Sequence, residues 1–234
     1  MKLVEPLLAR KDLAGLTTLL RSRWTAEQLA QMLGEAQGKA HQDARKLAAL
    51  GLALVGNKCC IPTLAAQLKD PDRMTNQMAE HALWSIWFRC GQEQANHHLC
   101  RGSQALEQRD LIAAKRHFTA AIDADPCFAE AYNQRAIVEC LSERYAQSIE
   151  DCQKAVQYMP CHFGAWAGMG HCQTQLGKMA QALESYKRAL EINPHLEGIA
   201  EAVRQISRQM VGPMGEQSSG AGDQVNSRKR RSKR

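Results

Sequence analysis

Residues 165–194 read AWAGMGHCQTQLGKMAQALESYKRALEINP, and the spacing of a few residue types in this stretch recurs twice upstream. The closing proline, Pro194, is preceded at intervals of 34 residues by Pro160 and Pro126. Five further columns keep this interval: Ala121/Ala155/Ala189, Gly102/Ala136/Gly170, Ala114/Ser148/Ala182, Phe118/Cys152/Tyr186 and His98/Tyr132/Trp166. Periods of about 20–50 residues are typical of stacked repeat proteins, so the centre of the chain is predicted to be three similar units.

Each unit is expected to be a pair of helices. Two helices approach closely only where small side chains lie at their crossing, and the Gly and Ala columns supply these. A proline after each second helix ends that helix and begins the turn to the next unit. The predicted fold is therefore an all-α solenoid with units at 95–128, 129–162 and 163–196, closed by a helix at about 195–210 whose outer face is polar.

The pattern resembles the tetratricopeptide repeat, and the third unit matches best, with Trp166, Gly170, Ala182, Tyr186 and Pro194 in place. The first two units depart from it, because His98 and Cys152 replace the usual large residues. Ala105, Glu139 and Gln173 stand where the family commonly has tyrosine, which predicts looser packing there. The resemblance implies a non-enzymatic protein that binds a peptide or helix of another protein in a concave groove.

The first helices of successive units line that groove in the family. By register, this predicts a nearly uncharged partner-binding surface whose amide side chains would bond an extended peptide backbone. The predicted residues are Asn96, Leu99, Ser103, Glu130, Asn133, Gln134, Ile137, Gly164, Gly168 and His171. The alternative for each of them is an ordinary solvated helix face.

One binding mode of the family is disfavoured by these residues. In this mode, lysine, asparagine and arginine at fixed groove positions bind the terminal carboxylate of a chaperone tail. Those positions hold Leu99, Ser103, Gln134, Gly164 and Gly168 here, and Asn133 is one residue out of register. We therefore expect another kind of peptide partner.

Residues 1–91 are predicted to form a separate helical region. Here the period is about 31 residues, pairing Ala48 with Ala79, Leu52 with Leu83 and Val55 with Ile86. With the LKDPD turn at 68–72, this resembles a HEAT-type repeat of the short bilin-lyase-like subclass, and it implies packing and no catalytic residue. Trp84, Trp87 and Phe88 are expected either in the junction between the two regions or as an exposed anchor for a partner.

Two earlier helices are predicted before this repeat. Thr25 and Gln28 have the spacing of a capping box that opens a helix running to about residue 38. A helix at about 12–21 is expected to pair with it as a hairpin.

The basic residues are concentrated in a tail at 211–234, which is rich in Gly, Ser and Gln and is predicted to be disordered. Six of the 30 Lys and Arg lie within its last seven residues, 228–234, so residues 1–227 have 30 − 6 = 24 basic and 24 acidic residues. The alternative function is thus weak nucleic-acid or other polyanion binding through this tail, or nuclear targeting in a eukaryotic cell. Its basic residues are Arg228, Lys229, Arg230, Arg231, Lys233 and Arg234.

Nine cysteines occur without a CxxC pair, and Glu5, Arg10, Lys11 and Asp12 interrupt any apolar leader. We expect reduced thiols in a cytoplasmic protein, no membrane span, no cofactor and no metal site. No phosphate-binding loop, nucleophile elbow or HExxH motif is present. An enzyme or redox protein that uses its thiols is the third hypothesis, and it would require a cysteine with a lowered pKa.

Overall fold

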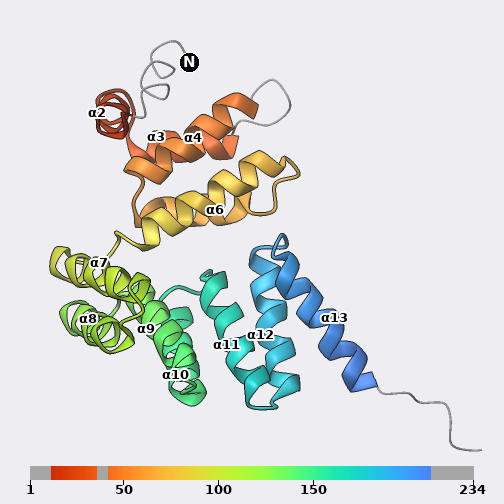
Figure 1. The fold of residues 1–234 in the computed structure, drawn as a ribbon. Helices are drawn as coiled ribbons and strands as arrows, with labels where there is room; N and C mark the ends of the chain where they lie inside the picture. The colour runs from red at the N-terminus through yellow and green to blue at the C-terminus, as the bar shows by residue number, and fades with distance from the viewer. Residues whose placement is uncertain (1–11, 36–41, 212–234) are drawn as a thin grey trace, which may run out of the picture.

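The computed structural model describes residues 12–35 and 42–211, which form helices and short turns with no strand among them (Figure 1). The all-α solenoid predicted from the sequence is the observed fold. The predicted tail, with its basic residues at 228–234, lies outside the described residues.

The 34-residue units are three antiparallel helical hairpins in a row, and each packs on the next (Figure 1). Helix α13 (Glu197–Val211) packs on the last hairpin with Ile206 buried and Glu201 and Arg204 exposed. The hairpins are α7 (Glu93–Glu107) with α8 (Leu111–Ala124), α9 (Ala129–Leu141) with α10 (Tyr145–Tyr158), and α11 (Phe163–Gln175) with α12 (Met179–Ile192).

Glycine permits the close helix crossing in the first and third hairpins. A Cβ atom added at Gly170 would lie 2.6 Å from the ring of Tyr186, and Gly102 faces Phe118 in the same way. The second hairpin has Ala136 and Cys152 at these positions, both buried. A larger residue on the first helix is thus matched by a smaller one on the second, which keeps the crossing filled.

The turn inside each hairpin repeats an unusual backbone conformation at intervals of 34 residues. Arg109, Glu143 and Gly177 have φ values of 61°, 59° and 72°. This left-handed region ends many helices and is free of steric cost only for glycine. Two of the three turns therefore place a non-glycine residue where it is disfavoured.

Two positions that were expected to pack loosely are instead filled by polar contacts. Glu139 is buried and forms ion pairs with Lys115, at 2.6 Å, and with Arg144. Gln173 is buried and its Oε1 accepts a 2.7 Å hydrogen bond from the Ser185 hydroxyl. The expectation of looser packing was wrong at both, because the substituting residues found hydrogen-bond partners.

The N-terminal region contains two further hairpins. Helix α3 (Ala26–Glu35) pairs with α4 (Gln42–Val55), and the short helices η2 (Lys58–Cys60) and α5 (Ile61–Gln67) precede α6 (Arg73–Trp87). The 31-residue interval relates α4 to α6, which pack side by side, with Ala48, Leu52, Ala79 and Leu83 buried between them. The resemblance to HEAT repeats remains a prediction.

The capping box at Thr25 and Gln28 is confirmed, but the hairpin predicted between the helix at about 12–21 and the helix after Thr25 is wrong. The Thr25 backbone N–H donates to Gln28 Oε1 at 2.8 Å, and the Gln28 N–H donates to the Thr25 hydroxyl at 3.2 Å. Helix α2 (Leu13–Arg23), however, packs on α4 through Leu16 and Leu20 and does not pair with α3. Residue spacing located the helix but not its neighbour.

The N-terminal region folds back onto the edge of the stack where the first helices of the hairpins begin (Figure 1). Trp87 is buried there and stacks on the His162 ring, and Phe163 joins the same apolar core. Asn193 Nδ2 donates to Glu80 Oε2 at 3.2 Å across the same interface. Of the two alternatives for the tryptophans, the structure places Trp87 in the junction core.

Candidate protein-binding groove

The concave side of the stack holds an open cavity of about 400 Å³. Helices α9 and α11 form most of its wall, and α10, α12 and α13 contribute the rest. Trp84, on α6, adds one further side chain to the wall. The lining residues are Trp84, Asn133, Ala136, Ile137, Cys140, Leu141, Ser148, Cys152, Gly164, Ala167, Gly168, His171, Tyr186 and Ile199. None of these is Lys, Arg, Asp or Glu, so the cavity favours uncharged groups.

Five of the predicted partner-binding residues line this cavity, namely Asn133, Ile137, Gly164, Gly168 and His171. Ile137 is 39% exposed and His171 is exposed, whereas Asn133 is buried. The register of the repeat therefore brought these five residues to one cavity, and their role in binding a partner stays a prediction.

The first unit's share is different, and three predicted residues do not line the cavity. Leu99 is 0% exposed and belongs to the core between α7 and α9. Asn96 holds the chain leading into α7, since its Nδ2 donates to the carbonyls of Arg89 at 3.0 Å and Gly91 at 2.8 Å. The Ser103 hydroxyl donates to the Leu99 carbonyl at 3.1 Å. For Leu99 the groove prediction is wrong.

Glu130 and Gln134 also do not line the cavity, because they belong to a buried polar cluster. Glu130 Oε2 lies 2.7 Å from His162 Nε2, and Gln134 Nε2 donates to Glu130 Oε1 at 2.7 Å. His162 Nδ1 accepts the Ala165 backbone N–H at 3.1 Å, so the ring proton sits on Nε2 and is donated to Glu130. The Glu130 carboxylate therefore holds in place the histidine that caps α11, and it is unavailable to a partner.

Sequence reasoning missed the contribution of the N-terminal region. The Trp84 ring contacts both His162 and Phe163 edge-on, with centroids 5.6 and 5.5 Å away. A Cβ atom added at Gly164 would lie 2.7 Å from this ring, so glycine is required for the tryptophan to reach the groove wall. Nothing in the 34-residue pattern points to it. Leu141, by contrast, lies one helical turn after Ile137 and was open to the register argument.

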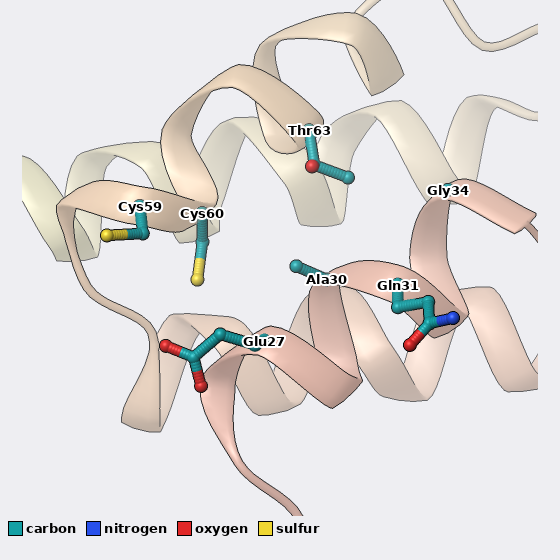
Figure 2. Close-up of a pocket in the computed structure, with 7 residues that line it drawn as sticks. All are labelled: Glu27, Ala30, Gln31, Gly34, Cys59, Cys60 and Thr63. Atoms are coloured by element: carbon teal, nitrogen blue, oxygen red, sulfur yellow. The ribbon is translucent and has the colours of Figure 1, made fainter.

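A second concavity lies in the N-terminal region between α3 and the η2–α5 segment, with a volume of about 340 Å³ (Figure 2). The exposed carboxylate of Glu27 and the thiol of Cys60 face it, while the Cys59 thiol is turned to a different side. Burial raises the pKa of Cys60. A protonated thiol is a weak nucleophile, so Cys60 is not an activated group.

The other shifted thiols show the same direction. Burial raises the pKa of Cys90 to about 11, and burial with a hydrogen bond involving Cys172 raises the pKa of Cys140 to about 12. Burial also raises the pKa of Cys152 and Cys161. All nine cysteines lie in the described residues as free thiols. Within the described ranges, no group of three or more His, Cys, Asp or Glu side chains is placed to hold a metal ion.

No helix in the described part of the chain combines the length and hydropathy needed to cross a bilayer. The fold and the uncharged concave cavity define a helical repeat protein. The tetratricopeptide repeat family matches residues 164–196, which span the third hairpin. The third hairpin therefore matches the tetratricopeptide repeat that the sequence pattern predicted there.

Known proteins with the same repeat resemble much of the chain. A TPR repeat-containing protein of Rhizobium etli is 28% identical over 152 residues, which is 64% of this chain and 74% of that protein. Other curated relatives are longer, and the chain spans 27% or less of their length.

Solved structures share the fold of about half the chain. The first TPR domain of human RPAP3 is 25% identical, with a TM-score of 0.50 over 52% of this chain and 95% of that domain. The first TPR of Spaghetti (RPAP3) bound to the HSP90 peptide SRMEEVD has a TM-score of 0.50 at 24% identity, over 51% of this chain and 94% of that one.

Proposed function

We propose that this chain is a non-enzymatic adaptor that holds another protein in the cavity between α9, α11 and α13. The observation that carries the proposal is the cavity itself, which is open, about 400 Å³ in volume and free of charged lining residues. Apolar concave sites of this size are the usual binding places on a protein surface. Ile137 and Leu141, 39% and 58% exposed, lie on its rim and leave apolar surface for a partner to cover.

The chemistry of the cavity also indicates what it does not take. An acidic peptide such as SRMEEVD, bound in the Spaghetti structure, carries carboxylates that need cationic partners. The lining here offers no lysine or arginine. We therefore infer a partner that presents uncharged groups.

Two observations on buried reactive groups favour an adaptor over an enzyme. The buried His162–Glu130 pair is fully enclosed and serves the start of α11, so it is closed to a substrate. The shifted thiols have raised pKa values and are held protonated. The expected cytoplasmic location, and a nuclear one in a eukaryotic cell, remain predictions.

A matched pair of substitutions tests the adaptor function. Ile137→Glu places a charge on the groove rim, whereas Ile112→Glu places the same charge on α8 outside the cavity, at a side chain that is 86% exposed. Proteins that co-purify with the full chain are quantified by mass spectrometry for the wild type and both variants. We expect a defined set of partners to be lost from Ile137→Glu and kept by Ile112→Glu.

Equal recovery of every partner by the two variants would remove the groove from the proposed function. Circular dichroism of both variants provides the folding control. Both variants should keep the helical signal of the wild type, because Ile137 is partly exposed and Ile112 is largely exposed.

A further inference from the structure

The amide side chains that the sequence assigned to the groove are already engaged within the protein. Asn96 donates to two backbone carbonyls, and Asn133 and Gln134 both donate to Glu130, at 3.3 and 2.7 Å. An extended peptide leaves its backbone N–H and C=O groups exposed and needs partners for them at regular intervals. Asn96 and Gln134 do not line the cavity and Asn133 is a single amide there, so the three do not supply that row of partners.

The remaining polar groups of the lining are few. The Ser148 hydroxyl donates to the Ala136 carbonyl at 2.8 Å. Trp84 and His171 keep ring nitrogens without a hydrogen-bond partner in the described structure, and they come from different helices. Two isolated groups do not match the repeating pattern of an extended backbone. A partner that satisfies its own backbone bonds, as an α-helix does, has no such need.

Helix α11 presents a bare face to the cavity. Ala167 and Gly168 share that face, with His171 one turn further, while Gly164 on the same face is covered by the Trp84 ring. A Cβ atom added at Gly168 would meet only Cys152 Sγ, at 3.5 Å, so the space in front of it is open. Small side chains let another helix lie close to this backbone.

Large apolar side chains flank this bare face on three sides. Ile137 and Leu141 stand on α9, Ile199 on α13, and Trp84 on α6. A helix laid along α11 would therefore find apolar walls on either side and could place its own apolar residues between them. This is the arrangement by which an amphipathic helix binds a groove, through residues at i, i+3, i+4 and i+7.

We propose that the occupant of the cavity is an amphipathic α-helix of a partner protein, lying against Ala167 and Gly168 with large uncharged side chains in the cavity. The inference rests on the proposed adaptor function and deepens it, because it names the structure and chemistry of the bound segment. The polar face of the helix would remain in solvent, which the uncharged lining requires.

A displayed library of random 18-residue peptides, selected on the immobilised full chain, tests this. A peptide of this length forms a helix of about 27 Å. We expect the selected sequences to repeat apolar residues at helical spacing, and the synthesised peptides to gain helical circular dichroism when they bind. Affinity for the Gly168→Leu variant, which fills the cavity, should fall at least about tenfold.

Two further variants make the result decisive. Gly198→Leu adds the same side chain at an exposed position of α13 with nothing within 4 Å, and should bind within about twofold of the wild type. Leu141→Glu alters the exposed rim without entering the core and should also weaken binding, which guards against misfolding of Gly168→Leu.

The outcomes separate the two proposals. Selection of proline-rich or extended sequences, or of acidic C-termini, that still lose affinity for Gly168→Leu would overturn the helix and keep the groove. In the opposite case, every selected peptide would bind Gly168→Leu and Leu141→Glu as tightly as it binds Gly198→Leu. That result would overturn both the helix and the adaptor function.

Discussion

The Trp87 ring lies 4.2 Å from the His162 ring, centroid to centroid, with only 15° between their planes. His162 also caps α11 through Nδ1, and its Nε2 is hydrogen-bonded to Glu130. One stacked contact therefore joins the N-terminal region to the second and third repeats. The position of Trp84 on the groove wall depends on this junction, because the two tryptophans are one turn apart on α6.

Replacing Trp87 by alanine should lower the free energy of unfolding by about 3–5 kcal/mol, since the side chain is fully buried and leaves a large cavity. Urea denaturation of the full chain measures this. Phe88→Ala, at the half-exposed next position, should cost less than about 1.5 kcal/mol. Equal costs would show that the stacked contact contributes little.

Glycine at the left-handed turn positions should stabilise the chain. Glu143 has a φ of 59°, a conformation that costs a non-glycine residue about 1 kcal/mol. Glu143→Gly is therefore expected to raise the midpoint of thermal unfolding, and Gly177→Ala, at φ 72°, to lower it. A lower midpoint for Glu143→Gly would mean that its side chain offsets the backbone cost.

The helix crossing of the third hairpin should tolerate an exchange copied from the second. Gly170→Ala alone pushes a Cβ atom into the Tyr186 ring and should destabilise the chain by about 1–3 kcal/mol. Combined with Tyr186→Cys it reproduces the Ala136–Cys152 pair, so the double variant should be more stable than the sum of the two single changes predicts. Denaturant unfolding of all four proteins gives the coupling energy, and strict additivity would contradict this account of the crossing.

The Glu139 ion pairs should make stability depend on pH. Burial alone would raise the pKa of Glu139, but hydrogen bonds from Lys115 and Arg144 outweigh it and hold the pKa below its ordinary value. A lowered pKa in the folded state means that the carboxylate stabilises the fold above the unfolded value, about 4.3, and that this contribution is lost as the pH falls through the folded value. Wild type and Glu139→Gln should thus differ in stability at pH 7, and the difference should shrink as the pH falls below about 4.3.

The same experiment contains its own check. Urea midpoints are compared at several pH values, and a difference that is constant from pH 7 to pH 3 would assign the effect of Glu139 to packing instead of charge.

The basic tail makes a separate prediction. The other residues carry 24 basic and 24 acidic side chains, so deleting 227–234 should abolish salt-sensitive binding to nucleic acid. Fluorescence anisotropy of a labelled single-stranded oligonucleotide at two salt concentrations measures this. Binding that survives the deletion would place the site on the folded part of the chain.

The sequence by itself determined the repeat, the helices and several of their ends. Those features rest on local rules: Gly170 faces Tyr186 because both stand at positions where the two helices of every unit cross, and Thr25 bonds Gln28 because they are three residues apart. Ile137 and His171 are 34 residues apart and both line the cavity, as the same register predicted.

Only the tertiary structure decided how the two regions meet and what that does to the groove. Asn76 contacts His195, 119 positions later, and Trp84 reaches Gly164 from outside the repeats. A 34-residue period fixes the spacing of units but not the curvature of the stack, so it does not reveal which distant side chains the curve brings together. For the same reason the burial of Leu99 and Glu130 was hidden from the sequence. Their cover comes from packing neighbours that no local spacing identifies.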